Sequence, residues 1–100
     1  MSDDGFAERQ LAVLEGRLSA YAEGGMSLNS LISDIWGLAD VIENKALSEQ
    51  VFPLLADLEE INAICIVYNE KPTPNDVEKI NASLAEIRRI FHDWQAGDGA

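Results

Sequence analysis

Apolar residues recur along this chain at alternating steps of three and four, the spacing that places side chains on one face of an α-helix. The first such stripe runs from about Phe6 to Ala22 and contains Ala7, Leu11, Leu14, Leu18 and Tyr21. The second runs from Leu28 to about Lys45 and contains Leu28, Leu31, Ile35, Leu38 and Ile42. The last contains Val77, Ile80, Leu84, Ile87, Phe91 and Trp94. Each stripe predicts an amphipathic helix.

The most apolar segment lies between Leu47 and Glu70. Its main stripe contains Val51, Leu54, Leu58, Ile61, Cys65 and Tyr68. Ile64 and Val67 lie on the far side of the same helix. A helix that is apolar on two sides must be covered on two sides, by its own chain or by another one. We therefore expect the other three helices to pack around this one.

Turn and capping residues mark the boundaries of these helices. Gly24 suits the left-handed turn that ends the first helix, and Ser27 suits the cap of the second. Thr73, Pro74 and Asp76 form a strong start signal for the fourth.

The start of the third helix is open on sequence alone. Ser48 is a candidate cap, but Pro53 would then fall inside the helix and clash with the carbonyl of Glu49. Alternatively, the helix begins near Phe52, with Pro53 in the first position that proline favours. We expect a short turn of helix at 48–52 that runs into the main helix from Pro53.

Four helical stripes joined by short connections predict one all-α domain over residues 1–100. The expected architecture is an antiparallel up-and-down four-helix bundle, with helices at about 6–22, 28–45, 53–70 and 74–94. A chain of 100 residues is long enough to bury a core without disulfides or metal. The glycine-rich tail, residues 95–100, is expected to be frayed.

The distribution of charge narrows the range of partners. The chain has a net charge of −11. Residues 18–70 contain nine acidic residues and a single basic one, Lys45, so most of the negative charge sits in the middle of the chain. This negative charge repels nucleic acid, because proteins bind its phosphates with clustered Lys and Arg. Solubility alone explains many acidic proteins, and the sharper hypothesis is a basic protein partner.

No residue pattern here indicates a chemical reaction. One His and one Cys cannot make a zinc site, and no Glu lies three residues before His92, as a di-metal helical bundle would require. His92 is expected near the end of the last helix, where a cation interacts favourably with the dipole. Glu59 and Glu60 diverge on the helix, and no phosphate-binding loop is present. We expect no enzyme activity, no cofactor and no metal.

The cellular location follows from what the sequence lacks. The first ten residues are acidic and have no apolar core, unlike a signal peptide. The longest apolar run, Ala63 to Tyr68, is too short to cross a bilayer. Cytoplasmic residence without membrane contact is the expectation.

Recognition of another protein is the remaining class of function. Trp36 lies on the same side of its helix as Asp40 and Glu43, and tryptophan often anchors interfaces whose flanking charges suit the partner. The alternative is a tryptophan that folds its ring over the edge of the bundle. The remaining candidate contact residues are acidic, although each could equally be an ordinary solvated residue: Asp34, Asp57, Glu59 and Glu60.

Two stretches, GGMSLNSLISDIWGLADVI and LEEINAI, resemble the small acidic immunity proteins that bacteria encode beside secreted nuclease toxins. The class includes contact-dependent growth inhibition and colicin-like systems. The residues that carry the resemblance are Gly25, Ser27, Leu28, Leu31, Ile32, Asp34, Leu38, Leu58, Glu59, Ile61 and Ala63. The resemblance implies a protein that binds its cognate basic toxin domain in the cytosol and blocks the active site or substrate groove. It supplies no contact residues by position.

A second hypothesis comes from the apolar far side of the third helix. Ile64 and Val67 would form a self-complementary patch, and the chain would then be a homodimeric adaptor or structural module.

Overall fold

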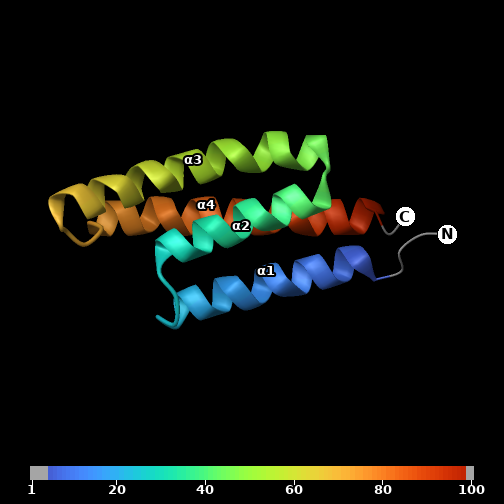
Figure 1. Cartoon of the computed structure of the whole chain (residues 1–100), viewed down its shortest axis with the longest axis horizontal. Coiled ribbons are helices and arrows are strands. Elements are labelled where there is room, and N and C mark those ends of the chain that lie inside the picture. The colour runs from blue at the N-terminus through green and yellow to red at the C-terminus, as the bar shows by residue number, and fades with distance from the viewer. Residues whose placement is uncertain (1–4, 99–100) are drawn as a thin grey trace.

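A computed structural model of the chain describes residues 5–98, which form four helices (Figure 1). They are α1 (Phe6–Ala22), α2 (Leu28–Ile42), α3 (Lys45–Tyr68) and α4 (Pro74–Asp98). Each helix runs antiparallel to the next and packs against it, and α4 closes the ring against α1. The residues described include no strand. The prediction of an all-α four-helix bundle is confirmed.

The core is a line of aliphatic side chains contributed by all four helices. Complete burial of one such side chain contributes about 1.5–3 kcal/mol to folding. The ten largest fully buried side chains are Phe91, Leu14, Leu31, Ile35, Leu47, Leu55, Leu58, Ile80, Ile87 and Val51. Among the side chains that the structure describes, none that is polar or charged is buried. The apolar stripes alone therefore account for the packing.

Three of the expected helix boundaries are present. Ser27 Oγ accepts a hydrogen bond from the Ser30 amide at 3.1 Å and caps α2. Gly24 has φ 81°, the left-handed conformation that glycine adopts without steric cost. Thr73 and Asp76 cap each other: the Asp76 amide donates to Thr73 Oγ1 at 3.1 Å, and the Thr73 amide donates to Asp76 Oδ2 at 3.2 Å.

The expected start of α3 is wrong. The helix begins at Lys45, capped by Asn44, whose Oδ1 accepts from the Leu47 amide at 2.9 Å, and it continues through Pro53 without a break. Leu47 and Val51 are core residues, so their burial stabilises the part of α3 that precedes Pro53. Pro53 itself is exposed, and the carbonyl of Glu49 that loses its partner lies on the solvent side of the helix.

Three helix ends also differ from expectation. α2 ends at Ile42 rather than residue 45, because Glu43 is left-handed with φ 54°, and α3 ends at Tyr68 rather than residue 70, because Asn69 has φ 52°. α4 continues to Asp98, so the expected end at residue 94 is wrong and residues 95–98 are helical. Residues 99–100 lie outside the described range. The early start of α3 gives the end of α4 a neighbour, since Trp94 and Gly97 line a hollow together with Asn44 and Leu47.

The hairpin formed by α3 and α4 is longer than the hairpin formed by α1 and α2. α3 and α4 have 24 and 25 residues, whereas α1 and α2 have 17 and 15. At about 1.5 Å per residue, the nine extra residues of α3 over α2 extend it by roughly 13 Å. Figure 1 shows the consequence: the connected ends of α3 and α4 project beyond α1 and α2. We call this projecting part, residues 61–77, the hairpin tip.

Candidate functional site

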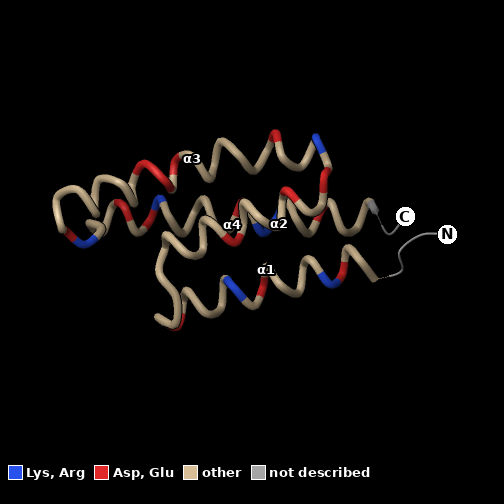
Figure 2. The backbone as a smooth tube through the Cα atoms, in the orientation of Figure 1, with Lys and Arg blue, Asp and Glu red and all other residues tan. Residues whose placement is uncertain are grey.

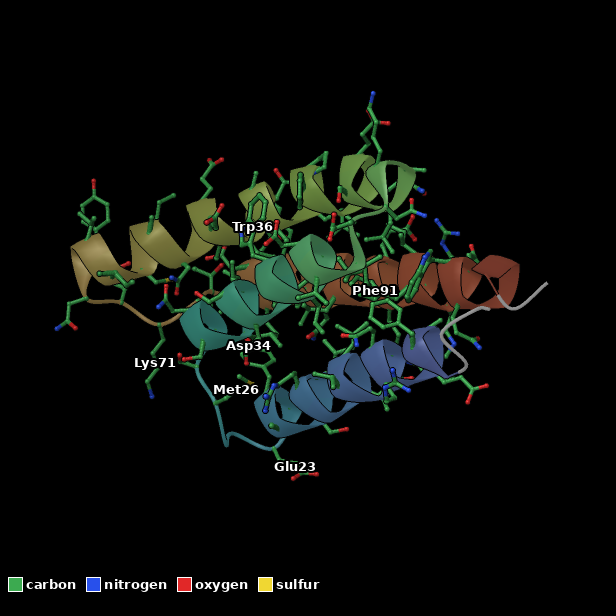
Figure 3. All side chains as sticks on the ribbon, turned by 45° about the vertical axis from the view of Figure 1, so that its right-hand side comes forward. Glu23, Met26, Asp34, Trp36, Lys71 and Phe91 are labelled. Carbon is green, nitrogen blue, oxygen red and sulfur yellow. The ribbon has the colours of Figure 1, made fainter. Side chains whose placement is uncertain are left out.

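Trp36 of α2 stacks on Phe52 of α3. The ring centroids lie 4.3 Å apart with an angle of 32° between the planes. Both side chains are half-buried and pack against the core, so the pair covers the junction of the two helices. Figure 3 shows Trp36 at this junction. Trp36 therefore folds over the edge of the bundle, and part of its side chain remains exposed.

Carboxylates surround this aromatic pair. Asp40 lies one turn after Trp36 on α2, and Glu43 follows where α2 ends. Glu59 lies seven residues after Phe52, on the same side of α3. All three acidic residues are exposed. We call the surface of Trp36, Phe52, Asp40, Glu43 and Glu59 the acidic seam.

Asp34 does not belong to the acidic seam. It lies two residues before Trp36, about 200° away around α2, on the side that faces α1 (Figure 3). There its Oδ2 lies 3.1 Å from Arg17 Nε, in an ion pair. The candidate contact residues of α2 are thus divided between two sides of the helix, and Asp34 already has a partner within the chain.

Asp57 and Glu60 lie beyond the seam on α3. Asp57 is on the side toward α4, and with Glu60 it borders an open hollow of about 460 Å³ that Lys79 also lines. Glu60 lies about 100° from Glu59, facing outward. Both carboxylates extend the negative surface from the seam toward α4, and neither touches the aromatic pair.

Three of the basic side chains, Arg17, Arg88 and Arg89, lie on α1 and α4 and form ion pairs. Arg88 Nε donates to Glu15 Oε1 at 2.7 Å and so joins α4 to α1. Arg89 donates to both Glu86 and Asp93 at 2.6 Å. On α2 and α3, Figure 2 shows acidic positions along both helices and one basic position, Lys45, at the start of α3.

Most carboxylates of α2 and α3 are unneutralised; the exceptions are Asp34, paired with Arg17, and Glu49, which lies 4.0 Å from Lys45. On these two helices and the connection between them, the acidic residues that form no ion pair are Asp40, Glu43, Asp57, Glu59 and Glu60. Elsewhere in residues 5–98, Glu8, Glu23, Glu70, Asp76 and Glu78 likewise form no ion pair. Uncompensated negative charge on one side of a molecule produces a directed field, which a basic partner can follow. Among the ring pairs of the described residues, only Trp36–Phe52 joins α2 and α3.

Sequence reasoning missed two contacts. Phe52 was assigned to the start of a helix because Pro53 follows it, so its stacking on Trp36 was not expected. His92 is not in the last turn, since α4 continues to Asp98, and its Nε2 lies 2.9 Å from Glu15 Oε2. The pKa of the Glu15 carboxyl is lowered by the hydrogen bond from Arg88 and then by the contact with His92.

Cys65 is half-buried at the hairpin tip rather than enclosed in the core. Over residues 5–98, the His, Cys, Asp and Glu side chains form no cluster of three that a metal ion would require. In the same range, no helix combines the length and apolar character needed to cross a membrane. Comparison with protein-family models, curated proteins and solved structures gives no match to this chain.

Proposed function

We propose that this chain is an immunity protein that binds and neutralises a basic toxin domain through the acidic seam. The observation that carries the proposal is the Trp36–Phe52 pair, partly exposed and surrounded by carboxylates that have no basic partner within the described residues. Few residues carry most of the energy of a protein interface, and tryptophan is enriched among them. The seam offers such an anchor with a charged rim.

The charge of the seam favours a nuclease as the toxin. A domain that binds phosphodiester backbones does so with clustered Lys and Arg. Asp40, Glu43 and Glu59 are exposed carboxylates that such a cluster would attract. An inhibitor with these groups would occupy the surface that the nucleic acid needs. Inhibition in this account is competition for a basic groove, and the immunity protein carries out no chemistry.

Asp57 and Glu60 have a secondary role in this proposal. They lie outside the aromatic centre and lengthen the negative surface, so they increase the rate of encounter more than the lifetime of the complex. Asp34 is left out, because the Arg17 guanidinium already neutralises it. The contact surface is therefore formed by α2 and α3 alone.

The direct test uses the protein encoded by the adjacent gene as the probe. We expect the two purified proteins to form a 1:1 complex, and the complex to suppress cleavage of plasmid DNA. We expect the affinity to fall as salt is raised, because exposed charges are screened. Poly-L-lysine serves as a control for binding by charge alone. Absence of a complex at low salt, with both proteins folded, would overturn the proposal.

A further inference from the structure

The end of α3 is apolar around its whole circumference. Residues 64–68 are Ile, Cys, Ile, Val and Tyr, and consecutive residues of a helix are about 100° apart, so together they occupy every side. Ile64, Ile66, Val67 and Tyr68 are 52%, 65%, 74% and 67% exposed. A helix that is apolar all round is normally buried. Here the hairpin tip projects beyond the helices that would have covered it.

The exposed residues divide into two sides of α3. Ile66 continues the side that carries Phe52 and faces α2 along the body of the bundle. Ile64, Val67 and Tyr68 share the outer side, at steps of three and one, with Ala63 at its edge. We call these four residues, 63, 64, 67 and 68, the outer strip. All four residues of the outer strip are exposed.

The outer strip is complementary to itself when two copies of α3 pack antiparallel. We place the two-fold axis between residues 65 and 66. Each residue then lies opposite the residue of the second copy that is equally far from the axis in the other direction along the sequence. Ile64 then meets Val67 of the second copy, and the small Ala63 meets the large Tyr68. Large residues opposite small ones are the arrangement that fills space between two helices.

Charge also favours a second copy at this place. The hairpin tip, residues 61–77, contains two acidic residues, Glu70 and Asp76, and one basic residue, Lys71, so its net charge is −1 in a chain of net charge −11. Two copies repel each other over most of their surface, and at the hairpin tip they approach against less repulsion. A strongly basic partner has no electrostatic reason to prefer the tip.

We infer that the chain forms a two-fold symmetric dimer in which the outer strips of two α3 helices pack antiparallel. The outer strip presents on the order of 400 Å² per copy, so the dimer buries about 800 Å² and falls among weak, concentration-dependent interfaces. Phe52 lies about 18 Å along α3 from Ile64, so the acidic seam stays open in the dimer. This inference does not rest on the proposed function.

The test is sedimentation velocity of the intact protein from micromolar to millimolar concentration. We expect the mass to rise from 11.0 kDa toward twice that value. Val67→Glu should abolish the rise. Ile66→Glu is the matched control, because it adds the same charge to an equally exposed neighbour on another side of α3, and it should dimerise like the wild type. Circular dichroism of both variants verifies that they are folded.

Two outcomes would overturn the inference: a wild type that stays monomeric at millimolar concentration, or a dimer that Ile66→Glu disrupts as fully as Val67→Glu. Salt separates this contact from toxin binding. Raising salt screens the repulsion between two acidic copies and should strengthen the dimer, whereas it should weaken the toxin complex. Failure of one proposal therefore leaves the other testable.

Discussion

The indole of Trp36 and the ring of Phe52 stack 4.3 Å apart across the junction of α2 and α3. This pair joins α2 to α3, and in the proposed function it also anchors the partner. On that proposal, stability and recognition depend on the same two side chains. Experiments on this site must separate the two effects.

Trp36→Ala tests the anchor. We expect it to weaken toxin binding by at least about 30-fold, the loss expected of an interface anchor. We also expect a stability loss of about 2 kcal/mol, since a half-buried aromatic ring and its stacking are removed. Tyr21→Ala is the control, because Tyr21 is a half-buried aromatic residue of α1 away from the seam. It should lose comparable stability and bind normally. Titration calorimetry at a temperature where both variants are folded measures the difference, and equal binding by both would contradict the anchor role.

Pro53→Ala tests the account of α3. Inside a helix, proline removes a hydrogen bond and clashes with the carbonyl four residues earlier, at a cost of about 3 kcal/mol. Pro53 is exposed, so alanine should raise the unfolding free energy by about 1–3 kcal/mol in urea denaturation. Pro74→Ala provides the comparison. Pro74 is the first residue of α4, where proline costs nothing, and its replacement should give no gain. A loss of stability in Pro53→Ala would show that the bundle requires a proline bend there.

The contact between Glu15 and Arg88 predicts a pH dependence. The hydrogen bond from Arg88 lowers the pKa of Glu15 below its ordinary value of 4.5, so the folded state favours the charged carboxylate. Its contribution to stability is present above about pH 4.5 and is lost as the pH falls through the lowered value. Glu15→Gln should reduce the melting temperature at neutral pH by a few degrees at most, because both side chains are partly exposed. The difference from wild type should vanish in acid, whereas Glu23→Gln, an exposed substitution without an ion pair, should show no such trend. A difference that persists unchanged in acid would contradict the role assigned to Glu15.

The sequence predicted the architecture because each stripe is regular over several turns. Leu31, Ile35 and Leu38 are buried as their spacing requires. The start of α3 was mispredicted because a local rule about Pro53 was given more weight than the burial of Leu47 and Val51, which depends on neighbouring helices. That error also concealed the hairpin tip. Helices at 28–45 and 53–70 have equal lengths and would leave no overhang.

The candidate site was only partly predictable. Helical geometry predicts Trp36, Asp40 and Glu43 on one side of α2, but α2 ends at Ile42 and Glu43 follows it in the left-handed conformation. Helical geometry cannot show that Arg17 of another helix lies beside Asp34, nor that Phe52 lies beside Trp36, because those contacts depend on which helices are neighbours. The position of Asp57 on the side toward α4 also depends on which helices are neighbours. Which carboxylates act together is a property of the packed bundle.

The central claim is that the acidic seam, and not the overall negative charge, captures a basic partner. Stopped-flow association with the purified toxin domain tests it in two triple variants that change the net charge equally: Asp40→Asn with Glu43→Gln and Glu59→Gln, against Glu8→Gln with Glu23→Gln and Glu78→Gln. At low salt we expect the seam variant to associate at least about 10-fold more slowly than wild type and the control variant to remain close to it. Equal slowing of the two variants, or no slowing of either, would contradict the claim.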